Sequence, residues 1–124
     1  MSEQQDTRRA RGVERLAQLD DQPGGEFFLA RMGDLGDYIV DFAFGDVHCR
    51  PGLSIEEREL IIVALLTSLG GCESQVQSHI RALRAIDVTY DKIEEVIIQT
   101  VPYVGVARAA NAMKVLRAEQ EHQD

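Results

Sequence analysis

A run of seven apolar residues, LIIVALL at positions 60–66, places the strongest constraint on how this chain folds. The run lies in a segment whose start resembles a helix N-terminus, because Ser54 and Glu57 have the spacing of a capping box. A helix is therefore expected over residues 55–69. Since its middle is apolar on every face, it must be the central core helix or must place one side against another subunit.

The rest of the chain shows helical spacing of apolar residues and almost no strand alternation. This predicts an all-α fold of about six helices. Besides residues 55–69, helices are expected over residues 9–19, 35–44, 72–86, 90–101 and 107–119, with a short piece over 27–32. Residues 1–8 are expected to form a flexible tail, and residues 9–124 a single domain, since 124 residues are enough to bury one core.

Several residues predict where these helices begin, end and face the core. Gly45 is expected to end the helix at 35–44, Thr89 to cap the helix at 90–101, and Pro102 to kink or end that helix. The inward stripes are expected to contain Val13, Leu16 and Leu19, then Val76, Ile80 and Leu83, then Ile93, Val96, Ile97 and Val101, and finally Ala110, Met113 and Leu116.

Charge and composition exclude several partners. A net charge of −8 and a pI near 4.8 disfavour nucleic acid, and the basic run at residues 8–11 is too short to offset this. The N-terminus has no apolar segment, and the run at 60–66 is shorter than the roughly 20 residues that a bilayer crossing needs. A cytoplasmic protein is expected, with no membrane partner and with Cys49 and Cys72 as reduced thiols.

Cys72, His79 and Glu59 are the candidates for chemistry. On a helix Cys72 and His79 share a face, but seven residues give about 10 Å of rise, which forbids a direct thiol–imidazole bond. Cys72 could instead be a small buried apolar residue, and His79 a helix histidine bonded to a neighbour. Glu59 directly precedes the apolar run, so it could be a partly buried carboxylate that relays protons to a histidine.

No metal site is expected, because the three histidines are widely separated and no HExxH or paired-cysteine spacing occurs.

A collinear set of short motifs over residues 35–118 resembles the carboxymuconolactone decarboxylase family. The motifs are Phe44-Gly45-Asp46-Val47, Arg50-Pro51-Gly52-Leu53-Ser54, Arg58-Glu59-Leu60, Ala64-Leu65-Leu66, Leu69-Gly70, His79-Ile80-Arg81-Ala82, Val88-Thr89, Ile93-Glu94-Glu95, Gln99, Tyr103-x-Gly105 and Ala109-Ala110-Asn111-Ala112. The resemblance implies an alkylhydroperoxidase D-like helical fold, assembled as a homo-oligomer, commonly a trimer or hexamer.

The resemblance also implies one of two chemistries. The first is cofactor-free decarboxylation of 4-carboxymuconolactone in aromatic catabolism. The second is a thiol-dependent peroxidase with a Cys-x-x-Cys motif, a histidine four residues later and a glutamate on the preceding helix. Cys72, His79 and Glu59 fall on that pattern, but Gln75 replaces the second cysteine. A non-catalytic oligomeric protein that binds a small molecule is the third alternative.

For the decarboxylase, the expected site contains His79 as general acid and Glu59 as its orienter or proton relay. Arg50 or Arg81 would hold a substrate carboxylate, and Tyr103 would line the pocket. The sequence departs from the family pattern at Gln75, where decarboxylases often have glutamate, and at Asp87 and Pro102. These departures leave the exact substrate open.

Overall fold

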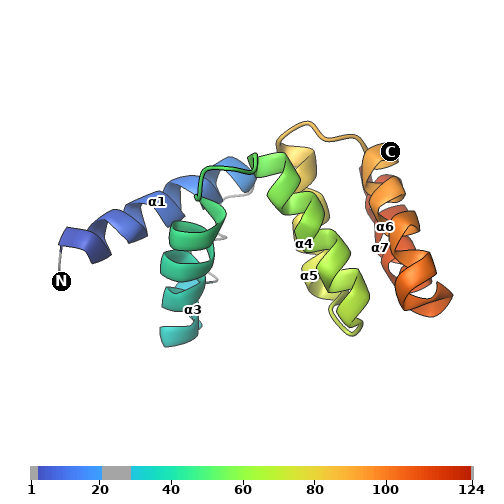
Figure 1. The fold of residues 1–124 in the computed structure, drawn as a ribbon, viewed down its shortest axis with the longest axis horizontal. Coiled ribbons are helices and arrows are strands. Elements are labelled where there is room, and N and C mark those ends of the chain that lie inside the picture. Colours follow the sequence, from blue (N-terminus) through green and yellow to red (C-terminus); the bar gives the residue numbers. More distant parts are fainter. Residues whose placement is uncertain (1–2, 21–28, 124) are drawn as a thin grey trace. The chain divides into compact units, whose positions relative to one another are not determined.

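The computed structural model describes residues 3–20 and 29–123 (Figure 1). Within these ranges the chain forms helices joined by turns and contains no strand, which confirms the predicted all-α fold. The chain divides into two compact units, Met1–Ile55 and Glu56–Asp124. The single domain expected over residues 9–124 stays a prediction.

The first unit contains α1 (Glu3–Leu19), α3 (Asp34–Tyr38) and η1 (Ile39–His48), a π-helix that continues α3 without a break. The first helix therefore begins six residues before its predicted start, and the flexibility expected for residues 1–8 stays a prediction. Ion pairs fix this end of α1, because the basic run at residues 8–11 meets acidic side chains of α3 and η1. The pairs are Arg8–Asp46, Arg9–Asp37, Arg9–Asp41 and Arg11–Asp46.

The expectation that Gly45 ends a helix was also wrong. Gly45 lies buried inside η1, which ends at His48. A Cβ atom on Gly45 would lie 2.4 Å from the carbonyl oxygen of Arg8, and one on Gly12 would lie 2.0 Å from that of Val40. The two glycines are therefore required because the backbones of α1 and η1 approach each other too closely for a side chain.

The predicted short piece at residues 27–32 is tested only in part. Phe27 and Phe28 lie outside the described residues, and residues 29–30 are helical, followed by a turn.

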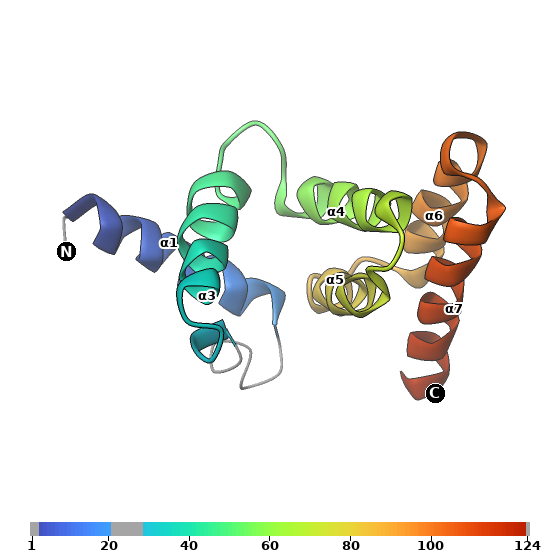
Figure 2. The ribbon, with the colours of Figure 1, turned by 90° about the horizontal axis from the view of Figure 1, so that it is seen from below.

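The second unit continues from α4 (Ile55–Leu69) and contains α5 (Glu73–Ala85), α6 (Tyr90–Val104) and α7 (Val106–Gln123). Helices α4 and α5 lie side by side and are joined by Gly70 and Gly71 (Figures 1 and 2), which have positive φ angles of 73° and 72°. The predicted cap is confirmed, because the Thr89 side chain accepts a hydrogen bond from the Lys92 backbone N–H at 3.2 Å. Helices α4 and α5 match their predicted bounds to within a residue.

Pro102 was expected to kink or end α6, and it does not end the helix. The helix continues to Val104 and ends at Gly105, whose φ of 93° is a conformation that glycine adopts readily. Pro102 lies in the last turn, so the single donor that it lacks removes only one hydrogen bond near a helix end. Helix α7 then extends four residues beyond the predicted end.

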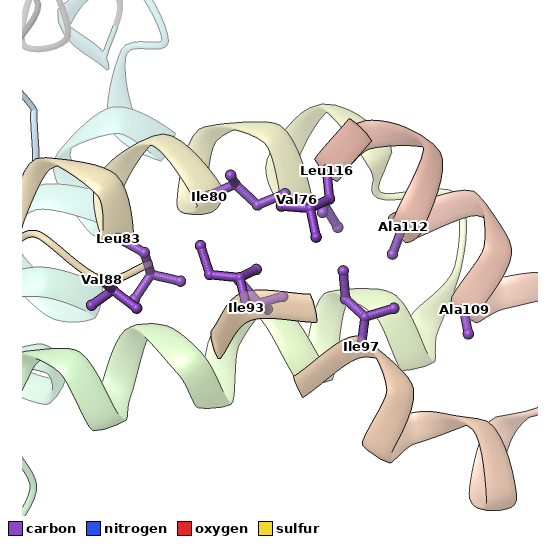
Figure 3. Packing of buried hydrophobic residues seen from close by; sticks show 10 residues of the cluster. Val76, Ile80, Leu83, Val88, Ile93, Ile97, Ala109, Ala112 and Leu116 are labelled. Carbon is purple, nitrogen blue, oxygen red and sulfur yellow. The ribbon is translucent and has the colours of Figure 1, made fainter. Parts of the chain in front are cut away.

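The core of the second unit is a cluster of apolar side chains from all four helices and the turn before α6 (Figure 3). It confirms the predicted inward positions Val76, Ile80, Leu83, Ile93, Ile97 and Leu116, and adds Val63, Val88, Ala109 and Ala112. The expectation for Ala110 was wrong, because Ala110 is exposed and Ala109 and Ala112 pack in its place.

Helix α4 is covered on one side only. Glu59, Val63 and Thr67 form its buried stripe, while Ile61, Leu65 and Leu69 are 45%, 58% and 68% exposed. The expectation that this exposed side meets another subunit stays a prediction.

Candidate functional site

The central feature of the site is a hydrogen bond between Glu59 of α4 and His79 of α5. Nδ1 of His79 lies 2.6 Å from Oε1 of Glu59. The Glu59 side chain is completely buried, and that of His79 is 21% exposed. A carboxylate removed from water in this way requires a hydrogen-bonding partner, and the imidazole supplies one. The structure thus brings together two of the three residues that were predicted to be catalytic.

The sequence positions both residues through the core stripes of their helices. Glu59 lies one turn before Val63 on the buried face of α4, and His79 lies three residues after Val76, which is buried on α5. Residues three or four apart lie on the same face of a helix, so the stripes that pack α4 against α5 also aim the two polar side chains at each other. The pair is therefore held by rigid helices rather than by a loop.

The second ring nitrogen of His79, Nε2, has no hydrogen-bond partner among the described residues. An ionised carboxylate only accepts hydrogen bonds, so the contact with an ionised Glu59 requires the proton of the ring on Nδ1. Nε2 is then the ring nitrogen that is left to bind another molecule. This arrangement can deliver a proton to a substrate, or remove one, from a fixed direction.

Cys72 lies elsewhere, at the N-cap position of α5. Its thiol is half-buried and donates a weak hydrogen bond to the carbonyl oxygen of Gly70, at 3.6 Å. Two turns of α5 separate it from His79, as the spacing predicted, and Gln75 is exposed between them.

Arg81 was predicted to hold a substrate carboxylate, but its Nε donates instead to Oε2 of Glu119 at 3.1 Å. Residues two apart on a helix point in nearly opposite directions, so Arg81 and His79 do not face the same space. Arg50 lies in the turn after η1, in the other compact unit, and its role stays a prediction.

Tyr103 is 82% exposed and lines an apolar groove of about 510 Å³ between α4 and α6. The other residues that line this groove are Leu60, Ala64, Ser68, Lys92, Glu95, Val96, Gln99, Thr100 and Val104. Glu59 and His79 are not among them. The groove therefore lies on a different side of α4 from the hydrogen-bonded pair.

The sequence prediction missed a second buried carboxylate, Glu119, which lies 6% exposed on α7. It accepts hydrogen bonds from Gln77 at 2.8 Å and from Arg81. Glu119 follows Leu116 by three residues, so continuing the inward stripe of α7 by one more turn would have placed it at the core.

Over residues 3–20 and 29–123 no three His, Cys, Asp or Glu side chains are grouped so as to hold a metal ion. Within those same residues, no helix has the length and apolar character to cross a membrane.

Comparison with known proteins agrees with this architecture. The model of the carboxymuconolactone decarboxylase family matches residues 33–118. A 4-carboxymuconolactone decarboxylase of Acinetobacter baylyi is 35% identical over 91 residues, which make up 73% of this chain. The aligned region spans 66% of that protein, just under two thirds of its length. The match to the family model covers more than half of the chain, and the chain therefore belongs to the carboxymuconolactone decarboxylase family.

Proposed function

We propose that this chain is an enzyme that decarboxylates a small carboxylated lactone without a cofactor. The observation that carries the proposal is the hydrogen bond between the buried Glu59 carboxylate and His79, which leaves Nε2 available to a substrate. The relative from Acinetobacter baylyi, a 4-carboxymuconolactone decarboxylase, supports this substrate class.

In the proposed reaction the bond between the lactone ring and its carboxylate carbon breaks, and carbon dioxide leaves. The electron pair of that bond moves into the unsaturated lactone and forms an enolate, which must then be protonated at carbon. His79 takes part as the doubly protonated ring: its Nε2–H gives the proton to the substrate carbon, and its Nδ1–H stays bonded to Glu59, which holds the ring in position. General acid catalysis of this kind contributes about 10² to 10⁴ in rate.

A cationic side chain would hold a second negative group of the substrate. Arg50 and Arg81 are the candidates for this role, and Arg81 also donates to Glu119 and lies on another face of α5 from His79. Tyr103 would contribute to the pocket only if the substrate, or a neighbouring subunit, extends to the groove between α4 and α6.

The direct test is the turnover of 4-carboxymuconolactone by the His79→Gln variant. The proposal expects turnover to fall at least about 100-fold while the far-UV circular dichroism spectrum stays unchanged. His122→Gln is the matched control, since His122 is exposed on α7. Near-wild-type turnover by His79→Gln would overturn the role of His79.

The alternative function is a thiol-dependent peroxidase, and the position of Cys72 at the N-terminus of α5 is the feature that favours it. In that case peroxide would be consumed with a dithiol donor, and Cys72→Ser would abolish the reaction. Gln75 cannot act as a resolving thiol, so a local dithiol cycle is disfavoured. A protein that binds a small molecule without turnover would show neither reaction.

The proposal includes a homo-oligomer, a trimer or a hexamer. The exposed stripe of Ile61, Leu65 and Leu69 on α4 supports this, because a continuous apolar face of a helix is stabilised when another surface covers it.

A further inference from the structure

Helix α5, which carries His79, is held between two buried carboxylates on opposite sides. On one side His79 bonds to Glu59 of α4. On the other side Gln77 and Arg81 both bond to Glu119 of α7. Both carboxylates belong to the second unit, and both are almost completely removed from solvent.

The spacing along α5 places these hydrogen bonds on two opposite faces of the helix. Gln77 and Arg81 are four residues apart, so they lie on one face of the helix. Each is two residues from His79, so the face that they share is directed away from the imidazole. A rotation of α5 that moved Gln77 and Arg81 away from Glu119 would therefore also move His79 relative to Glu59.

The two oxygens of Glu119 have different partners. Oε1 accepts from Nε2 of Gln77 at 2.8 Å, and Oε2 accepts from Nε of Arg81 at 3.1 Å. Because the two donors lie one helical turn apart, the carboxylate fixes α5 at two points rather than one. Two fixed points restrict both the rotation of the helix and its translation along the axis.

The charge state of Glu119 agrees with this role. Burial by itself would raise the pKa of Glu119, but the hydrogen bonds from Arg81 and Gln77 and the charges of Arg81 and His122 outweigh burial and leave the pKa below its ordinary value. The same ion pair raises the pKa of Arg81. Both groups are therefore ionised near neutral pH, and the hydrogen bonds between them are charge-assisted.

We propose that Glu119 is a positioning residue, which acts through Gln77 and Arg81 to set the orientation of α5 and thereby the hydrogen bond between His79 and Glu59. The expected effect on turnover rests on the proposed role of His79 in catalysis. The expected effect on the orientation of His79 does not. It also assigns Arg81 to positioning of the helix rather than to substrate binding.

The experiment compares Glu119→Gln with the wild-type chain by NMR and by steady-state kinetics. Glutamine keeps the size of the side chain and one acceptor oxygen but removes the charge. In ¹⁵N-labelled protein the Nδ1–H resonance of His79, assigned by its loss in His79→Gln, is expected to shift or broaden. The kcat for 4-carboxymuconolactone is expected to fall roughly tenfold, as for other groups that orient a functional histidine, while KM changes less than about twofold.

Glu121→Gln is the matched control, because Glu121 is exposed on the same helix two residues further on. It is expected to change neither the resonance nor kcat. Gln77→Met is the second variant, since it removes one of the two donors and leaves the Arg81–Glu119 ion pair in place. It is expected to move the same resonance by a smaller amount, and it provides the measurement if Glu119→Gln does not fold.

An unchanged Nδ1–H resonance in folded Glu119→Gln or Gln77→Met overturns the inference. Lower stability of the variant would not rescue it, because a purely structural role of Glu119 would also lower stability. A shifted resonance with unchanged kcat has a different meaning. It supports the positioning of His79 by Glu119 and overturns the proposed role of His79 in catalysis.

Discussion

The carboxylate of Glu59, which has no exposure to solvent, lies 2.6 Å from Nδ1 of His79, which remains partly exposed. This relationship gives the two residues different tasks. Glu59 cannot contact a substrate directly from its buried position, whereas the exposed part of His79 can. In the proposed reaction Glu59 would therefore act by orienting the imidazole rather than by touching the substrate.

This division of tasks predicts the effect of Glu59→Gln. The amide can still accept from Nδ1–H, but it is neutral, and it can also turn its NH₂ group toward the ring. We expect kcat to fall by about 10 to 100-fold with little change in KM, because the substrate does not touch position 59. The measurement is steady-state turnover of 4-carboxymuconolactone.

Glu57→Gln serves as the control for this variant, since Glu57 is exposed on the same helix and glutamine also fits a capping box. Equal loss of kcat in both variants would mean that a change in α4, and not the bond to His79, is responsible.

The helices around the site were predictable because local signals mark their ends. Gly70 and Gly71 adopt positive φ angles between α4 and α5, and Thr89 accepts the hydrogen bond that caps α6. The pairing of Glu59 with His79 was expected from the resemblance to the family, in which a glutamate on the preceding helix assists the histidine. The helix ends depend on short stretches of sequence and on helical periodicity.

The features that were missed depend on contacts between distant segments. Gly45 has the local signature of a helix end, but its function is to let the backbone of α1 pass close to η1. The contact of Arg81 with Glu119, which lies 38 residues away on another helix, was missed, while the role of Arg81 as a substrate anchor stays a prediction. Periodicity places a residue on a face of its helix, but it does not say which side chain of another helix it will meet.

The close contact at Gly12 predicts a destabilising effect for Gly12→Ala. In an isolated helix this change would favour the helix by about 1 kcal/mol. Here the new Cβ would lie 2.0 Å from the carbonyl oxygen of Val40, so α1 and η1 must move apart. We expect a net loss of about 1 to 3 kcal/mol in the free energy of unfolding, typical of overpacking.

Urea denaturation followed by circular dichroism measures this loss. Ala10→Gly, at an exposed position of α1, calibrates the helix propensity at a site without the contact. If Gly12→Ala stabilises the protein, the close approach of α1 and η1 is wrong.

The lowered pKa of Glu119 predicts how stability depends on pH. Because the folded protein binds this proton less tightly than the unfolded chain, ionised Glu119 stabilises the fold above its ordinary pKa of 4.5. That contribution is lost as the pH falls below 4.5 and through the folded pKa. The difference in urea midpoint between the wild-type protein and Glu119→Gln is therefore expected to be largest at pH 6–7 and to shrink toward pH 3.

Measurements at pH 7, 5, 4 and 3 suffice, with Glu121→Gln as the exposed control. A difference that stays constant over this range would show that the charge of Glu119 contributes nothing to stability.

The exposed apolar stripe of α4 predicts that a single charge will change the state of association. Leu65 lies at the centre of the stripe, between Ile61 and Leu69, and is 58% exposed in the single chain. Burying a charged side chain without a partner costs several kcal/mol, so an interface that covers Leu65 cannot accept glutamate there. Leu65→Glu is expected to run as a 13.8 kDa species with unchanged helix content, whereas the wild-type chain is expected to run as a trimer or hexamer. Ala118→Glu, at an exposed position of α7, is expected to keep the wild-type mass. Sedimentation or light scattering gives these masses directly, and a wild-type mass of 13.8 kDa would leave the stripe without the covering surface proposed for it.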